Sequence, residues 1–125
     1  MPLVKMDYLK SKKSRLIVRE GNSNVLLNTS DILLIYSQNK IAYVLDKNGK
    51  KYISDKNLFQ LELELDEKIF FRANRQYIIS INFIKGYKSY KKVKLIVQLQ
   101  NMEINHTIVI SQVSASKFKT WLVNS

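Results

Sequence analysis

The chain has 125 residues and no cysteine, so it can bury the core of one domain, but it can form neither a disulfide nor a zinc site built on thiolates. With 21 Lys and Arg against 10 Asp and Glu, the formal net charge is +11, which favours polyanionic partners, nucleic acid first and an anionic membrane surface second. No run of about 18 apolar residues occurs, and the N-terminus lacks the uninterrupted apolar region of a secretory signal. We therefore expect a soluble, cytoplasmic protein.

The positive charge is concentrated in the second half of the chain. Residues 31–67 carry 5 basic and 7 acidic side chains, whereas residues 68–125 carry 10 basic side chains and only Glu103 as an acid. A face that serves only solubility usually mixes both signs. We interpret the second half as bearing a functional basic surface, with non-specific solubility charge as the alternative.

Most of the chain has the pattern of short strands separated by turns. The lysine-rich residues 1–13 precede these strands, and we expect them to be a linker or a flexible N-terminus ahead of one domain over residues 14–125. Asn48 and Gly49 predict a tight hairpin turn because both tolerate a positive φ, and residues 20–24 carry a weaker turn signal. Segments rich in Ile, Val, Leu and Tyr predict strands at 14–20, 25–28, 31–36, 41–45, 51–54, 76–84, 93–99 and 104–110.

The segment "SDKNLFQLELEL" fits two structures. Its apolar and polar residues alternate as in a strand, whereas Leu61 and Leu65 also fit one stripe of a helix. Ser54 or Asp55 could then cap that helix. The pattern leaves both interpretations open.

The C-terminus predicts a short amphipathic helix. Phe118, Trp121 and Leu122 follow a serine-rich start at the spacing i, i+3 and i+4, which places them on one helical face. Because large aromatic side chains dominate burial, we interpret Trp121 as a core residue and not as a ligand contact.

Residues suited to catalysis or metal binding are scarce. His106 is the single histidine, and a metal cluster around it would need carboxylates that this half of the chain lacks. The acidic residues of the "LELEL" region are typical of the solvated face of one element. We expect no enzyme activity, no metal and no cofactor, and we interpret His106 as a structural or exposed imidazole.

The stretch "FFRANRQYIIS", residues 70–80, combines two arginines and two amides with apolar anchors. One interpretation is a strand that carries a polar group of side chains to the rim of a sheet, where they meet a ligand. The other is a surface loop with two solvated arginines.

This stretch, together with "DILLIY" before a polar loop, a Leu-x-x-Leu segment and the terminal "FKTWL", resembles the LytTR family of DNA-binding domains, the output modules of many bacterial response regulators. The resemblance covers about residues 14–122. It implies an elongated all-β fold of antiparallel sheets with a short internal helix, which would make residues 56–65 helical, and a short C-terminal helix. It also implies that loops enter successive DNA major grooves.

The resemblance implies a set of DNA-contacting residues in three loops, with two lysines suited to phosphates. The loops comprise Ser37, Gln38, Asn39 and Lys40; Arg72, Asn74, Arg75 and Gln76; and Ser111, Gln112 and Val113; the lysines are Lys92 and Lys94.

These residue types suit the readout of bases. Arg donates a bidentate pair to guanine, and Asn and Gln match adenine, each pair discriminating by about 1–3 kcal/mol. Arg72 is expected on the DNA backbone or on a structural carboxylate. Many members of the family have Arg where this chain has Gln112 and His where it has Asn74, so the preferred bases are expected to differ, with a site richer in A·T as one outcome.

The expected partner is double-stranded DNA with two repeated half-sites, bound by a domain that is a monomer or a weak dimer off DNA because it lacks a heptad repeat. Nothing resembles a receiver domain, so we expect an excised output domain, or an input domain on another chain or in a membrane segment. The alternative is a pleckstrin-homology-like binder of anionic lipid headgroups or a scaffold module. We expect no lipid, because the basic residues cluster late in the chain and not in the first hairpin.

Overall fold

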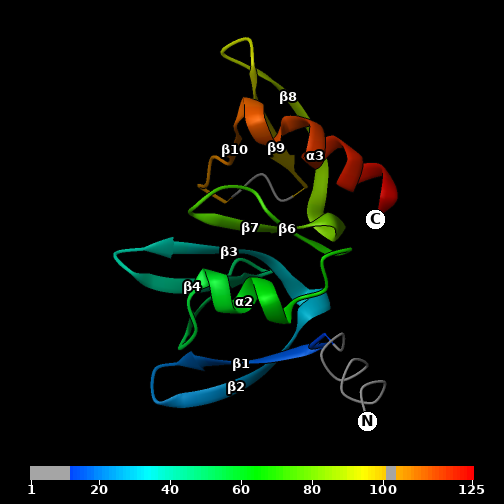
Figure 1. Ribbon diagram of the computed structural model, residues 1–125. Coiled ribbons are helices and arrows are strands. Elements are labelled where there is room, and N and C mark those ends of the chain that lie inside the picture. The colour runs from blue at the N-terminus through cyan, green and yellow to red at the C-terminus, as the bar shows by residue number, and fades with distance from the viewer. Residues whose placement is uncertain (1–11, 101–103) are drawn as a thin grey trace.

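Two antiparallel sheets and two short helices make up the computed structural model, which describes residues 12–100 and 104–125 (Figure 1). The larger sheet has the order β2-β1-β5-β4-β3-β7-β6, and the smaller has the order β10-β9-β8. The prediction of an all-β class with an internal and a C-terminal helix is confirmed. The elements are β1 (Arg15–Glu20), β2 (Ser23–Asn28), η1 (Thr29–Asp31), β3 (Ile32–Gln38), β4 (Ile41–Asp46), β5 (Lys51–Ser54), α2 (Leu58–Glu64), β6 (Phe70–Arg72), β7 (Tyr77–Ser80), η2 (Ile81–Phe83), β8 (Ile84–Tyr90), β9 (Lys94–Leu99), β10 (Val109–Ile110) and α3 (Gln112–Asn124).

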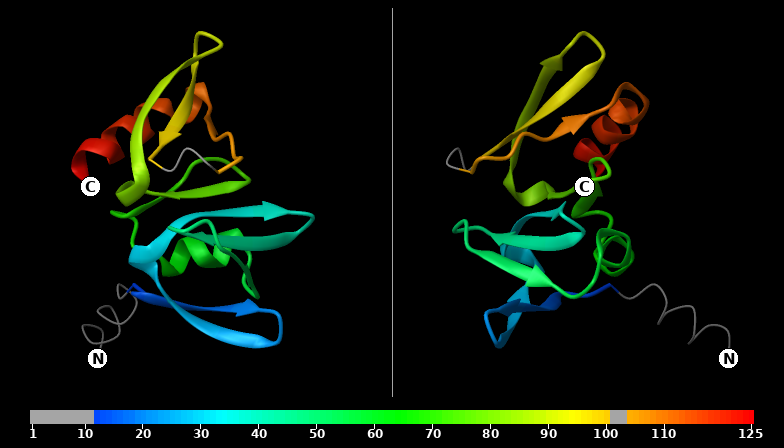
Figure 2. Two further views of the ribbon diagram at one scale, coloured as in Figure 1. Left: turned by 180° about the vertical axis from the view of Figure 1, so that it is seen from behind. Right: turned by 90° about the vertical axis from the view of Figure 1, so that its left-hand side faces the viewer.

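Strands β6 and β7 are buried on both faces because they separate two apolar cores. Phe71 and Ile79 belong to the core shared with the smaller sheet and α3, whereas Phe70 and Ile78 belong to the core under α2. Successive side chains of a strand point to opposite faces, so each strand serves both cores. Figure 2 shows the smaller sheet and α3 above the larger sheet, with α2 beside the middle of the larger sheet.

The predicted hairpin turns are present. Gly49 has φ of +81° in the β4–β5 turn, and the Asp46 carboxylate accepts hydrogen bonds there from the backbone N–H groups of Asn48 and Lys50, both at 2.9 Å. Gly21 has φ of +58° in the β1–β2 turn. Glycine adopts this left-handed backbone conformation without the steric cost of a Cβ.

The ambiguous segment forms the helix α2, and its cap is neither Ser54 nor Asp55. Asn57 caps the helix, because its side chain accepts from the backbone of Gln60 while the Gln60 side chain accepts from the backbone of Asn57. This reciprocal capping box satisfies two N–H groups that a helix start otherwise leaves unpaired. The Ser54 hydroxyl accepts instead from the backbone of Lys56 in the preceding turn.

Two predicted strands were too long, and one observed strand was missed. The predicted strand 76–84 ends at Ser80, whose hydroxyl accepts from the backbone of Asn82 and starts the one-turn helix η2. Only Val109–Ile110 of the predicted strand 104–110 pairs with a neighbour. The missed strand is β8, which is rich in Lys, Gly and Ser, whereas β6 is a three-residue edge strand within the stretch 70–80 for which a strand was one of two interpretations.

The expected linker lies mostly outside the described residues, because residues 1–11 are not among them. Lys12 and Lys13 contact the end of α2, where the Lys12 ammonium donates to the Leu63 carbonyl at 3.0 Å and the Lys13 N–H to the Glu64 carbonyl at 2.9 Å. None of the helices in the described part of the chain is long and apolar enough to cross a membrane.

Candidate nucleic-acid interface

Three loops that are distant in sequence meet at one end of the strands. The Ser37 N–H at the end of β3 donates to the Gln76 carbonyl at 2.9 Å, which joins the β3–β4 hairpin to loop 73–76. The Asn74 side-chain amide donates to the Val109 carbonyl at 2.9 Å, which joins the same loop to β10 just before α3. The structure therefore brings together the three loops that the sequence indicated separately.

The β3–β4 hairpin ends in a two-residue turn made of Asn39 and Lys40. Gln38 and Ile41 pair on either side of the turn, and φ is +52° at Asn39 and +66° at Lys40. Asparagine tolerates this conformation, but lysine adopts it at a cost of roughly 1–2 kcal/mol. Both side chains are exposed.

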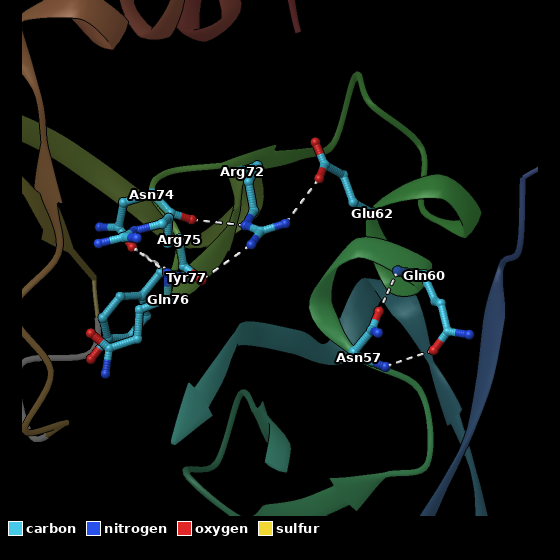
Figure 3. A network of polar contacts seen from close by, with 8 residues as sticks. All are labelled: Asn57, Gln60, Glu62, Arg72, Asn74, Arg75, Gln76 and Tyr77. Atoms are coloured by element: carbon cyan, nitrogen blue, oxygen red, sulfur yellow. Dashed lines mark hydrogen bonds and ion pairs between the residues drawn. The ribbon is translucent and has the colours of Figure 1, made fainter. Parts of the chain in front are cut away.

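Loop 73–76 is a closed turn organised by Asn74. The Ala73 N–H donates to the Tyr77 carbonyl at 2.9 Å, and the Asn74 Oδ1 atom accepts from the N–H groups of Gln76 at 2.8 Å and Tyr77 at 3.1 Å (Figure 3). An Asn side chain that binds its own backbone in this way fixes a turn.

Arg72 holds the same loop from the other side. Its Nε donates to the Asn74 carbonyl at 2.8 Å and its Nη2 to the Arg75 carbonyl at 3.1 Å, while Nη1 pairs with the Glu62 carboxylate of α2 at 3.0 Å. Figure 3 shows Arg72 between Glu62 and the loop. Each guanidinium nitrogen therefore donates one hydrogen bond within the protein, which uses three of the five N–H donors.

Arg75 and Gln76 are exposed and project from this braced loop. Within residues 12–100 and 104–125, neither side chain forms a hydrogen bond or an ion pair with another residue. Both extend away from Glu62 (Figure 3). Their donors and acceptors are open to a ligand, in contrast to those of Arg72.

Ser111 and Gln112 lie at the start of α3. Ser111 is the N-cap residue, its carbonyl accepts from the Ser114 N–H at 3.1 Å, and its hydroxyl forms no capping hydrogen bond. Ser111 and Gln112 are exposed, and Val113 is 91% exposed. The N-terminal end of a helix carries a partial positive charge, which favours a nearby phosphate.

The β8–β9 hairpin extends beyond the start of α3 and carries lysines at its tip. Leu95 of β9 pairs with Ile110, the residue before Ser111, so the hairpin continues past that point (Figure 1). Lys92 has φ of +69°, Lys91 has φ of +49°, and both are exposed. Lys94 is also exposed at the first position of β9.

A tyrosine–histidine pair lies behind loop 73–76. The Tyr77 hydroxyl is 2.7 Å from His106 Nδ1, and the rings of Tyr36 and His106 have centroids 4.4 Å apart. Burial lowers the pKa of His106, with a smaller effect of the Lys51 charge, and burial raises the pKa of Tyr77, with a smaller effect of Tyr36. The sequence left a structural or an exposed imidazole open for His106, and these contacts support the structural alternative.

The sequence placed Glu62 among solvated acids, and its side chain is 46% exposed, but the sequence did not identify Glu62 as the partner of Arg72. Glu62 follows the buried Leu61 in α2 and pairs with Arg72. A helix over this segment separates Glu62 from the apolar face. The sequence pattern fitted a strand equally well, so the side of the element on which Glu62 lies could not be predicted.

The comparison with known families decides the assignment. The model of the LytTr DNA-binding domain matches residues 22–123, which is most of the chain. The chain belongs to the LytTR family. This LytTR domain is also similar in structure to the LytTr DNA-binding domain of a Bacillus cereus protein described as a methyl-accepting/DNA response regulator, with a TM-score of 0.77, 21% identity, and coverage of 88% of this chain and 97% of the other. No curated protein matches the chain.

Membership of the LytTR family agrees with the DNA-binding interpretation of the sequence. The family is one of DNA-binding domains found in response regulators and not a catalytic one. This membership does not favour the alternative of a pleckstrin-homology-like lipid binder. In the described part of the chain, no cluster of His, Asp and Glu could hold a metal ion.

Proposed function

We propose that this LytTR domain is a transcriptional regulator that binds double-stranded DNA in a sequence-specific manner. The observation that carries the proposal is the convergence of loop 73–76, the β3–β4 turn and the start of α3, joined by hydrogen bonds, with unpaired polar side chains directed outward. Sequence is read by side chains that reach base edges in the major groove, and such side chains need free donors and acceptors.

The exposed residues divide into two chemical groups. Arg75 is the guanine reader, because its guanidinium is free to donate two parallel hydrogen bonds, and Gln76 and Gln112 are amides suited to adenine. Lys40, together with Lys92 and Lys94, neutralises phosphates, which needs no base-edge geometry. The Ser111 hydroxyl, free of a capping bond, serves either a base or a phosphate.

Arg72 acts in this proposal by holding loop 73–76 in place. We expected it on the DNA backbone or on a structural carboxylate, and its bonds to Glu62 and to two loop carbonyls support the second role. These bonds use three of the five guanidinium N–H donors and fix the orientation of the side chain, so Arg72 could turn toward a base edge only by breaking them.

The extended arrangement of the loops supports binding along the duplex. The β8–β9 hairpin lies on one side of loop 73–76 and the β3–β4 turn on the other (Figure 1). The loops would enter successive major grooves. One domain covers one half-site, and two domains occupy a pair of repeats in a promoter. Off DNA the protein is a monomer or a weak dimer.

The proposal places the domain in the cytoplasm, where bacterial DNA is found, under the control of a receiver or membrane input domain. The membership of a family found in response regulators supports this arrangement.

Selection of bound sequences from random duplex DNA tests the proposal directly. The immobilised chain should enrich a repeated motif, and the enriched duplex should bind more tightly than random DNA at the same salt concentration. Phosphoinositide vesicles at equal ionic strength serve as the comparison. Equal binding to all duplexes, or preference for the vesicles, would contradict the proposal.

A further inference from the structure

The side chain of Asn74 has almost no hydrogen-bonding capacity left for DNA. Both lone pairs of its Oδ1 atom are used by the N–H groups of Gln76 and Tyr77, and one Nδ2 hydrogen is used by the Val109 carbonyl. A bidentate contact with adenine needs the amide oxygen as acceptor and the amide nitrogen as donor. Asn74 could make that contact only by breaking the turn that displays Arg75.

The Val109 bond links two parts of the interface that otherwise belong to different sheets. Loop 73–76 connects two strands of the larger sheet, whereas Val109 lies in the smaller sheet, two residues before Ser111. β10 pairs with β9 through two residues, and the Ile108 carbonyl accepts from the Val97 N–H at 3.0 Å, but these bonds lie within the smaller sheet and do not join it to loop 73–76. The Tyr77 hydroxyl and His106 Nδ1, 2.7 Å apart, join the same two segments a few residues away.

We infer that Asn74 is a positioning residue that fixes loop 73–76 against the junction of β10 and α3, so that Arg75 and Gln76 read neighbouring base pairs together with Ser111 and Gln112 as one rigid unit. The inference rests on the proposed function and deepens it by removing Asn74 from the base-reading residues. Holding two contact groups in a fixed relation lowers the entropy lost when both bind.

Asn74→Ser separates the two roles of the amide. The serine hydroxyl can still accept from the backbone N–H groups of the turn, but it is too short to reach the Val109 carbonyl. Asn48→Ser, in the β4–β5 turn, is the matched control, because Asn48 takes part there through its backbone N–H. Gln112→Ala identifies the base positions that depend on the start of α3.

Sequence selection with these variants and with the unchanged chain gives the decisive comparison. Asn74→Ser should lower affinity for the selected site by roughly two- to tenfold, and it should weaken preference both at the bases next to Arg75 and at the bases that depend on Gln112. Affinity for random DNA and thermal stability should stay close to those of Asn48→Ser. Loss of preference at a single base pair would make Asn74 a base reader, and an unchanged profile or an equal loss on random DNA would also overturn the inference.

Amide spectra of the free protein test the link independently of DNA. In ¹H–¹⁵N NMR spectra, Asn74→Ser should shift the signals of residues 107–112 as well as those of residues 73–77. Shifts confined to residues 73–77 would show that the link to β10 does not restrain the junction. If the unchanged chain selects no DNA motif, the proposed function fails, whereas the spectra still decide whether Asn74 joins the two loops.

Discussion

The Tyr77 hydroxyl lies 2.7 Å from His106 Nδ1 and joins the first residue of β7 to the segment that leads into β10. The Tyr36 ring packs against the same imidazole. Burial, and then the charge of Lys51, hold the pKa of His106 below its ordinary value of 6.5. The imidazole is therefore neutral in the folded protein at a pH at which the unfolded chain begins to bind a proton.

We predict that the protein loses stability as the pH falls below about 6.5, because the unfolded state then binds a proton that the folded state excludes at His106. The free energy of unfolding, measured with urea at about pH 7.5 and about pH 5.5, should be smaller at the lower pH. His106→Gln removes this titration, so the variant should show a weaker pH dependence than the unchanged chain. Identical pH dependences would show that His106 does not contribute.

The second prediction is that the conformation of loop 73–76 depends on Arg72 and on its ion pair with Glu62. Glu62→Gln keeps a hydrogen-bond acceptor for Arg72, whereas Arg72→Ala removes three bonds and leaves the carbonyls of Asn74 and Arg75 without this donor. Arg72→Ala should reduce the free energy of unfolding by about 1–3 kcal/mol. It should also abolish preference for the selected DNA site, while Glu62→Gln should cause smaller changes in both measurements. A variant Arg72→Ala with full sequence preference would contradict the bracing role.

We predict that replacing Lys40 in the β3–β4 turn can raise the stability of the fold while it weakens DNA binding. This residue has φ of +66°, which glycine adopts freely, and Asn-Gly is the favoured sequence for such a turn. Lys40→Gly should raise the free energy of unfolding by roughly 1 kcal/mol and should weaken DNA binding, because a cation is lost. Lys40→Gln keeps the backbone cost and removes the charge, so it should weaken binding without the gain in stability. Equal stabilities of the two variants would show that the turn is not strained.

Ile79 tests the core that supports the interface. Its side chain is fully buried and belongs to the cluster shared by the two sheets and α3. Ile79→Ala should therefore lower the free energy of unfolding by about 2–5 kcal/mol. Val123→Ala, at a position that is 81% exposed, is the control and should change it by less than about 0.5 kcal/mol.

The sequence predicted the parts of the fold that are set by local chemistry. Asn48 and Gly49 form the predicted turn, and Phe118, half-buried Trp121 and Leu122 lie on the inner face of the predicted C-terminal helix. The cap of α2 was wrong because Ser, Asp and Asn are nearly equal as N-caps. Among these three residues only Asn57 is followed three positions later by Gln, which is the spacing of a capping box and was the signal in the sequence that identified the cap.

The site was predicted as a set of residues but not as an arrangement. The sequence allowed Arg72 either a DNA contact or a structural carboxylate, but it did not name that carboxylate. The environments of Arg72 and Arg75 differ because Glu62, ten residues before Arg72 in the chain, reaches Arg72 from α2. Contacts across such distances depend on tertiary packing, which no local pattern of side chains encodes.

Arg75 and Lys92 should affect DNA binding in different ways. Arg75 projects from a braced loop and has the planar donor pair that guanine requires, whereas Lys92 lies at an exposed hairpin tip as a single point charge. Arg75→Ala should cost about 1–3 kcal/mol on the selected site and relax preference at one base pair. Lys92→Ala should weaken binding to selected and random DNA alike, and it should reduce the slope of log affinity against log salt by about one.

Titrations of both variants at several salt concentrations separate these outcomes, because each neutralised phosphate contributes about 0.9 to the slope whatever the sequence. Lys117→Ala, on α3 beyond its first turn, is a control for the loss of one exposed charge away from the hairpin tip. If Arg75→Ala left base preference unchanged and lowered thermal stability instead, Arg75 would belong with Arg72 as a structural residue. The exposed and unpaired guanidinium of Arg75 argues against that result, because its removal breaks no hydrogen bond within the described chain.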